Sequence, residues 1–478
     1  MWIIATILVY FAVLFGISRL TGRLANNDTF FRANRRSPWY IVAFGMVGAS
    51  ISGVTFVSVP GMVTSIDMTY MQTCLGFILG YILVAFLLLP LYYRLNLTTI
   101  YSYLGQRLGP RSYKTGALFF LLSKLTGAVV RFYVVCMILQ RFVFDAMGVP
   151  FAVTVTGMVA LIWLYTRKGG IKTLVWTDTF QTVCLFGALL LIIYKVVGQL
   201  GMTLPEAIQA IAADTHSRMF VMDDWVSKQN FWKQFLSGVF IVIVMTGLDQ
   251  DMMQKNLTCK SLRDAQKDMC TYGVAFVPAN LLFLSLGVLL VMLAQAQGLP
   301  VATGDALLPD FVAQSGFSVV IPFTIGLVAA SFSSADSALT SLTTSYCVDI
   351  QGRAGDERLR KRVHLVICGL FVVMILLFRM LNSTSVIDAI YVLCGYTYGP
   401  LLGLFAFGIL TRRMPRDKVV PYICIASPLV CYAIDELTCR MTGYKLGYEL
   451  LMLNGLLTLT ALTVSSRGIP SAEPRNVS

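Results

Sequence analysis

A stripe of hydroxyl groups inside an apolar segment is the first feature of this sequence that suggests chemistry. The run Ala329-Ala-Ser-Phe-Ser-Ser-Ala-Asp-Ser-Ala338 reads as helix, and at 100° per residue one face of it gathers small and hydroxyl-bearing side chains. These are Ala330, Ser333, Ser334, Ser337 and Ser341. Hydroxyls on such a face join neighbouring membrane helices, or they combine with carbonyls released at a break in another helix to bind a hard cation such as Na⁺. Both interpretations remain open from these residues alone.

Three charged residues lie within apolar runs. Arg131 follows Thr126-Gly-Ala-Val-Val, Asp178 ends Trp176-Thr-Asp, and Asp336 lies on the flank of the hydroxyl stripe. A charge inside a membrane segment requires a partner, so Arg131 either binds a carboxylate of a substrate bidentately or forms a structural pair with an acid such as Asp336 or with free carbonyls. Asp178 is expected to face a polar interior, unless it is an interfacial acid near the cytoplasmic end. Asp336 either assists a cation or pairs with a base.

Two apolar segments are interrupted by flexible residues. Gly48-Ala-Ser-Ile-Ser-Gly53 lies in the middle of segment 38–59, and Thr246-Gly247 precedes the polar run Asp249-Gln-Asp251 at the end of segment 231–248. Glycine in a membrane helix often marks close packing. A matched pair of broken helices, one in each half of the chain, indicates the binding site of a secondary transporter.

The elements that carry these residues are membrane spans. Of 478 residues, 57% are hydrophobic and 13% charged, whereas a soluble protein is about one quarter charged. The long uninterrupted apolar runs favour helices over a membrane β-barrel, so the sequence predicts an all-α multi-pass protein with about thirteen transmembrane helices. We place them at 2–18, 38–59, 68–92, 113–145, 150–166, 173–196, 231–248, 271–297, 316–348, 363–380, 385–411, 419–437 and 447–465.

The charge distribution gives the expected topology. The net charge of +13 is spread over short loops, which excludes a nucleic-acid-binding domain and indicates the cytoplasmic side. One of these cytoplasmic loops is expected to contain Lys255, Lys260, Arg263 and Lys267. The bias predicts an amino terminus outside and a carboxyl terminus in the cytoplasm of a cell (inner) membrane, with the first segment kept as a helix.

No loop is long enough for a soluble domain, so we expect a single membrane domain. It divides into an extra helix and loop (1–37), a first repeat (38–196), an extracytoplasmic loop (197–230), a second repeat (231–411), and carboxyl-terminal helices with a short tail (412–478). Within the loop, Thr203-Leu-Pro-Glu206 is the capping-box pattern of a short helix. His216 with Asp223-Asp224 leaves an intramembrane transferase as a distant alternative. The two histidines and eleven cysteines, which form no CxxC, predict neither haem nor a bound metal.

Together these segments resemble the sodium/solute symporter family, which includes sodium/glucose, sodium/proline and sialic acid symporters. Besides the first broken segment, the resemblance rests on Gly169-Gly-Ile-Lys-Thr-Leu-Val-Trp-Thr-Asp178, Ala330-Ser-Phe-Ser-Ser334 and Gly395-Tyr-Thr-Tyr-Gly-Pro400. It implies a LeuT-like fold of two inverted five-helix repeats, each with a broken first helix, and alternating access to a central site. The resemblance also implies a main Na⁺ site formed by the carbonyls of Gly48, Ile51 and Ala330 and the hydroxyls of Ser333 and Ser334.

Some members of the family hold a second sodium ion. In this chain the matching residues are Asp178, Ser333, Ser334 and Ser337, while Asp336 stands where sialic acid symporters have a serine. That difference changes the geometry of the second cation site.

For the substrate, the resemblance implies that Arg131 binds a carboxylate and that Ser52, Thr55 and Gln72 add polar contacts. The acidic and amide pair that sugar symporters use after the first break is absent, since Val54-Thr55 stands there. An acidic substrate is therefore favoured.

The expected function is Na⁺-coupled symport of a small organic anion, such as sialic acid or another sugar acid, by a single chain without enzymatic activity. A neutral sugar, a polyol or an amino acid such as proline is the alternative. One Na⁺ carried with a monoanion moves no net charge and leaves about 1.4 kcal/mol at a tenfold gradient, whereas two leave about 5.1 kcal/mol at 100 mV. On this reasoning an anionic substrate makes a second Na⁺ worthwhile.

Overall fold

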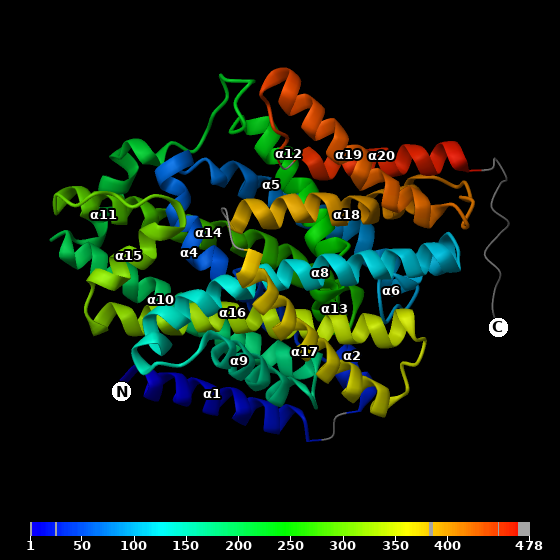
Figure 1. Cartoon of the computed structure of the whole chain (residues 1–478), viewed down its shortest axis with the longest axis horizontal. Helices are drawn as coiled ribbons and strands as arrows, with labels where there is room; N and C mark the ends of the chain where they lie inside the picture. The colour runs from blue at the N-terminus through cyan, green and yellow to red at the C-terminus, as the bar shows by residue number, and fades with distance from the viewer. Residues whose placement is uncertain (1, 24–25, 382–385, 448, 467–478) are drawn as a thin grey trace.

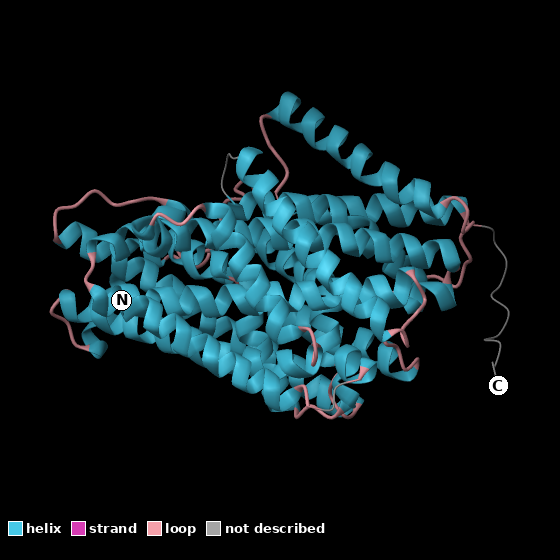
Figure 2. Cartoon of the chain, turned by 60° about the horizontal axis from the view of Figure 1, so that its bottom comes forward, coloured by secondary structure: helices cyan, strands magenta, loops and turns pink. Residues whose placement is uncertain are grey.

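The computed structural model of the chain describes residues 2–23, 26–381, 386–447 and 449–466. Over these residues helix follows helix, and the β-structure consists of one isolated bridge between Ser37 and Cys259. The helices form an elongated bundle with most connections at its two ends (Figures 1 and 2). The expected tail, from residue 467 onward, lies outside the described residues.

The helices differ widely in length. The long ones are α1 (Trp2–Thr21), α8 (Pro110–Leu139), α9 (Phe151–Thr166), α10 (Ile171–Gln199), α14 (Leu262–Ala296), α16 (Phe317–Ser345), α17 (Glu357–Leu381), α18 (Val386–Leu410), α19 (Val420–Thr442) and α20 (Glu449–Ser465). The shorter ones are α2 (Asn27–Arg32), α3 (Trp39–Ser50), α4 (Gly53–Ile66), α5 (Tyr70–Leu83), α6 (Leu89–Arg94), α7 (Ser102–Arg107), α11 (Leu204–Ala213), α12 (Phe231–Val242), α13 (Gln250–Asn256) and α15 (Leu307–Gln314). Single π-turns extend α5, α8, α12 and α16 without ending the rod.

The spans agree with those predicted from hydropathy. Within the described residues, seven helices are long and apolar enough to cross a membrane, and two bent pairs raise that number to nine. The four remaining expected spans coincide with shorter apolar helices, at Ala5–Thr21, Phe151–Thr166, Gly395–Leu410 and Glu449–Ser465. The chain is therefore a multi-pass membrane protein.

Both predicted breaks are present. Helices α3 and α4 meet at 62°, and the rod Phe231–Gly247 meets α13 at 71°. At the first break Ile51 leaves the helical region (φ −83°, ψ 88°), and the side chain of Ser52 accepts the backbone N–H of Thr55 to begin α4. At the second, the Asp249 side chain caps α13 by accepting the backbone N–H of Asp251. A polar cap directly after each break thus restarts the helix.

Glycines allow the broken helices to pack closely. A Cβ on Gly48 would lie 2.0 Å from the Thr182 hydroxyl of α10, and one on Gly53 would lie 2.1 Å from the Ser331 hydroxyl of α16. The alternative interpretation of these glycines as close-packing residues is therefore correct as well, because close packing and the break occur in the same segment.

The expected short helix of the extracytoplasmic loop is α11. Thr203 and Glu206 form the predicted capping box, with the backbone N–H of Thr203 donating to Glu206 Oε2 at 2.7 Å. This hydrogen bond lowers the pKa of the exposed Glu206 carboxyl.

One assignment made from charge is wrong. Lys255, counted as a cytoplasmic-loop residue, lies on α13 and its side chain is only 2% exposed. Arg360, also near a span end, is 2% exposed and lies over the ring of Phe30 at 4.3 Å. Basic residues that follow an apolar run are not always solvated, because a broken helix places its second half inside the protein.

Candidate functional site

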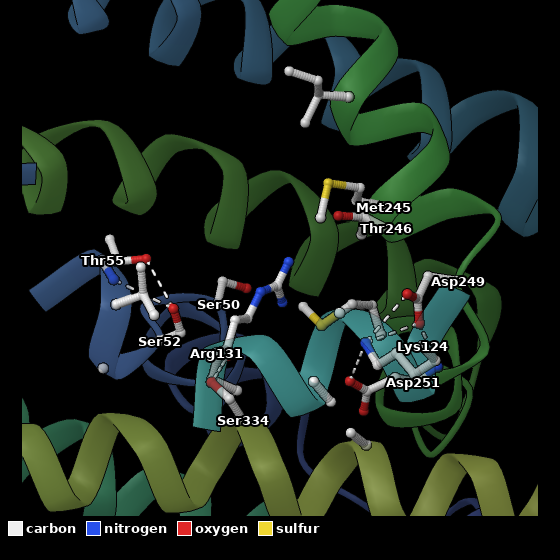
Figure 3. A pocket seen from close by; sticks show the side chains of 18 of the residues that line it. Ser50, Ser52, Thr55, Lys124, Arg131, Met245, Thr246, Asp249, Asp251 and Ser334 are labelled. Carbon is white, nitrogen blue, oxygen red and sulfur yellow. Dashed lines mark hydrogen bonds and ion pairs between the residues drawn. The ribbon is translucent and has the colours of Figure 1, made fainter. Parts of the chain in front are cut away.

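A cavity of about 160 Å³, lined by both polar and apolar side chains, lies where the two broken helices, α8 and α16 meet. The residues that line it include Ser50, Ser52, Thr55, Lys124, Arg131, Thr246, Asp249, Asp251, Tyr272, Ser334 and Tyr398. Figure 3 shows the side chain of Arg131 between the end that carries Ser52 and Thr55 and the end that carries Lys124 and its two carboxylates. Residues from both halves of the chain thus converge on one space, as the matched breaks predict.

Within the described residues, Arg131 is the one charged side chain of this cavity lining without a protein partner. It is half-buried, and among the described residues it forms neither an ion pair nor a hydrogen bond. Asp336, the acid considered as its structural partner, instead accepts a hydrogen bond from the Tyr165 hydroxyl at 2.6 Å. The structural-pair alternative for Arg131 is therefore not observed, and the guanidinium is free to bind an anion.

Ser52 and Thr55 lie at the start of α4, facing the same cavity. Their hydroxyl oxygens are 3.2 Å apart, and Ser52 also caps the helix. Because α4 begins here, its first backbone N–H groups and the positive end of its dipole point toward the cavity region. This arrangement favours anionic or hydroxyl-bearing ligands.

Gln72 does not belong to the cavity in this structure. It is fully buried on α5, and its amide donates to the carbonyls of Thr69 and Gln229 and accepts the backbone N–H of Val221 at 3.0 Å. All of its polar atoms anchor the extracytoplasmic loop, so we correct its assignment from a substrate contact to a loop anchor. The resemblance could not distinguish these roles, because the loop partners lie about 150 residues away in the chain.

A charged cluster that the sequence did not identify closes one end of the cavity. Lys124 Nζ lies 2.6 Å from Asp251 Oδ2 and 3.2 Å from Asp249 Oδ2, and the Tyr398 hydroxyl donates to Asp249 at 2.6 Å. Lys124 precedes Arg131 by seven residues on α8, a spacing that puts both on one helix face. That spacing is the signal that could have found it.

The carbonyls freed at the first break face α16. Ser334 Oγ lies 3.2 Å from the carbonyl of Ala49 and 3.1 Å from that of Ala330, so one hydroxyl connects the end of α3 with the hydroxyl stripe. Gly48 O accepts the N–H of Ile51 at 3.1 Å. This set of carbonyl and hydroxyl oxygens is chemically suited to Na⁺, and it includes Gly48, Ala330 and Ser334 of the predicted main site.

At the second break the backbone carbonyls accept hydrogen bonds from tyrosine hydroxyls. The hydroxyl of Tyr92 donates to the carbonyl of Gly247, and that of Tyr101 donates to the carbonyl of Leu248, both at 2.9 Å. The two breaks thus differ in their donors, which are tyrosine hydroxyls at the second break and the Ser334 hydroxyl at the first. The first break alone presents its carbonyls to a serine hydroxyl that lines the cavity.

The residues predicted for a second cation are already engaged. Ser333 Oγ donates to Asp178 Oδ1 at 2.7 Å, and the buried ammonium of Lys255 lies 2.8 Å from Asp178 Oδ2. The hydroxyl of Ser337 lies 3.3 Å from Asp336 Oδ1. Asp178 therefore faces a polar interior of the protein as predicted, but a protein cation lies against it.

The residues considered for a transferase do not assemble. Asp223 pairs with the exposed Arg218 at 3.3 Å, Asp224 caps a turn, and His216 contacts Asp214 at 2.9 Å. Across the described ranges no group of three or more His, Cys, Asp and Glu side chains could hold a metal ion. The loop charges have local partners and form no shared site.

Comparisons with known proteins agree with this architecture. The sodium:solute symporter family matches residues 30–417. A sodium/sialic acid symporter of Proteus mirabilis is 24% identical over 87% of this chain and 88% of its own length. The sodium-coupled monocarboxylate transporter 2 of Bos taurus is 27% identical over 84% of this chain and 68% of its own.

A solved structure supports the fold. A Na⁺-coupled sialic acid symporter in a substrate-bound, outward-open state superposes with a TM-score of 0.83 over 98% of this chain and 99% of that one, at 21% identity. The predicted LeuT-like arrangement with broken first helices is therefore confirmed, and Na⁺ is the coupling ion that family membership entails. With its broken helices, central cavity and family match over most of its length, this chain belongs to the sodium:solute symporter family.

Proposed function

We propose that the protein carries a small organic anion, a sugar acid of the sialic acid type, together with Na⁺ into the cell by alternating access. The observation that carries this proposal is the guanidinium of Arg131, which lines the central cavity and has no protein partner in the part of the chain that the structure describes. A charged side chain within membrane-spanning helices is unfavourable without a partner, and a carboxylate satisfies a guanidinium with two parallel charge-assisted hydrogen bonds.

The rest of the cavity suits a hydroxyl-rich ligand. Hydroxyls of Ser52, Thr55 and Thr246 line it, and the Ser50 hydroxyl is hydrogen-bonded to that of Tyr272. Two relatives point the same way, because sialic acid and a monocarboxylate, the solutes in their names, are both carboxylates. This agreement supports an acidic substrate over a neutral sugar, a polyol or an amino acid such as proline.

Sodium is assigned to the first break. The ligands proposed are the carbonyls of Gly48, Ile51 and Ala330 with the hydroxyls of Ser333 and Ser334, and the contacts of Ser334 with α3 and α16 support this choice. Binding of Na⁺ there would fix the angle between α3 and α4, and so the position of Ser52 at the substrate.

The topology and the division of the chain remain part of the proposal. The amino terminus is assigned to the outside and the carboxyl terminus to the cytoplasm of the cell membrane by the positive charges of the loops. The repeats are assigned to 38–196 and 231–411, each beginning with a broken helix, and the working unit to a single chain.

Uptake into proteoliposomes tests the proposal. Labelled sialic acid, other sugar acids and neutral sugars are offered to the purified full-length chain under an inward Na⁺ gradient or a matched K⁺ gradient. Uptake of an acid that requires the Na⁺ gradient is expected. Uptake of neutral compounds only would contradict the role given to Arg131, and equal uptake in both gradients would contradict Na⁺ coupling.

A further inference from the structure

The ion pair between Lys255 and Asp178 lies at the place where the family resemblance puts a second cation. Lys255 Nζ is 2.8 Å from Asp178 Oδ2, and the two side chains are 2% and 1% exposed. Lys255 belongs to α13, the second half of a broken helix, whereas Asp178 belongs to α10. The ammonium therefore reaches across from the other half of the chain to fill the position.

Both oxygens of the Asp178 carboxylate are used by the protein. Ser333 donates to Oδ1 at 2.7 Å, and the Lys255 ammonium lies against Oδ2. A sodium ion at this carboxylate would have to lie beside a positive charge in an interior of low dielectric, where repulsion between like charges is strong. A second Na⁺ and the ammonium are thus mutually exclusive at Asp178.

Further acidic side chains lie around Lys255. Besides Asp178, the carboxylates of Asp251 and Asp336 are near enough to interact with the ammonium electrostatically. Opposite charges around a buried lysine favour its protonated form over a neutral amine. The ammonium of Lys255 therefore lies among acidic side chains, with Asp178 in direct contact.

We infer that the ammonium of Lys255 is a built-in replacement for a second coupling ion, so that each transport cycle carries one Na⁺. This inference deepens the proposed function and rests on it for the Na⁺ site at the first break. A tethered ammonium stabilises Asp178 as an ion would, but it never leaves the protein and so draws no energy from a gradient.

The inference reverses the expectation of two sodium ions. One Na⁺ carried with a monoanion moves no net charge, so transport is insensitive to the membrane potential. At a tenfold Na⁺ gradient, accumulation is then limited to about tenfold. The position of Lys255 on a broken helix also explains why the residue escaped recognition in the sequence.

Counting the bound ions tests the inference without a substrate. Equilibrium binding of ²²Na⁺ to the purified full-length protein should saturate at one Na⁺ per chain. Saturation at two would overturn the role of Lys255 and leave Na⁺ coupling intact. The absence of saturable binding would overturn the proposed Na⁺ site and, with it, this inference.

Two variants make the test specific. Lys255→Ala leaves Asp178 buried without a cation and should bind two Na⁺, whereas Lys255→Arg retains the charge and should bind one. If folded Lys255→Ala still binds one Na⁺, the Lys255–Asp178 pair is only structural and the inference fails. If that variant does not fold, the count for the unmodified chain decides.

Discussion

Replacing Arg131 separates substrate binding from stability, because this side chain has a place in the cavity but no partner in the described part of the protein. Truncating one partner of a buried, hydrogen-bonded charge pair costs about 2–5 kcal/mol of binding free energy. Arg131 is half-buried, which favours the lower part of that range. Two to three kcal/mol corresponds to a rise of roughly 30- to 150-fold in the dissociation constant of the acid.

Lys124 provides the matched control. It lies seven residues earlier on the same helix and lines the same cavity, but it is held by Asp249 and Asp251 at 3.2 and 2.6 Å. Breaking such a buried pair leaves carboxylates without compensation and costs about 3–5 kcal/mol of folding stability. Arg131→Gln should therefore weaken binding with little change in the thermal unfolding midpoint, while Lys124→Met should lower that midpoint strongly.

The assay measures the dissociation constant of the acid for the detergent-purified protein at saturating Na⁺, alongside the unfolding midpoint of each variant. Arg131→Lys retains the charge but not the planar fork, so its affinity should lie between those of the unmodified chain and Arg131→Gln. Unchanged affinity in folded Arg131→Gln would refute the reasoning. A large loss of stability in that variant would reveal a structural partner that the reasoning assumes to be absent.

Four further substitutions, the last of them a control, give distinct outcomes. Ser334→Ala removes a hydroxyl that connects α3 and α16 and should raise the Na⁺ concentration for half-maximal uptake roughly tenfold or more. Unchanged Na⁺ dependence would mean that the hydroxyl stripe serves only helix packing. Gln72→Leu leaves buried backbone groups of the loop without partners and should lower the unfolding midpoint by an amount equivalent to about 1–3 kcal/mol. The affinity for the solute should stay the same. Loss of affinity in a stable protein would return Gln72 to the substrate site. Gly238→Ala places a Cβ 2.2 Å from the carbonyl oxygen of Thr73 and should destabilise the protein by about 1–3 kcal/mol. Gly187→Ala is the control, because Gly187 has open space around it and the substitution should not destabilise the protein. Equal thermal unfolding midpoints for the two variants would refute the close crossing of α5 and α12.

Features that depend on residues close together in the sequence could be predicted from the sequence. The spans follow from apolar runs of about 20 residues, and both breaks follow from flexible residues next to polar ones inside such runs. The capping box at Thr203 and Glu206 lies within four residues and formed as expected. Asp178 was assigned to a polar interior because a buried acid requires one.

Features that depend on contacts between distant segments could not be predicted. Lys255 and Asp178 are 77 residues apart, and no residue near either one in the sequence indicates that the two side chains pair. Lys255 follows an apolar run, so hydropathy placed it in a loop, although a 71° bend turns it back into the protein. Gln72 was misassigned for the same reason, since its partners belong to a loop packed against α5 only in three dimensions.

The partners of the buried charges distinguish their roles. In an interior of low dielectric every charge must be compensated, and the protein itself compensates Lys124 with Asp249 and Asp251 and Lys255 with Asp178. A lysine compensated in this way is fixed in place and unavailable to a ligand. Arg131 faces the cavity without such a partner among the described side chains, so its compensation is expected from what enters the cavity. The same need for a compensating charge thus gives the two side chains different roles. Lys255 has the Asp178 carboxylate beside it and is a permanent substitute for an ion, whereas Arg131 binds the carboxylate of the solute.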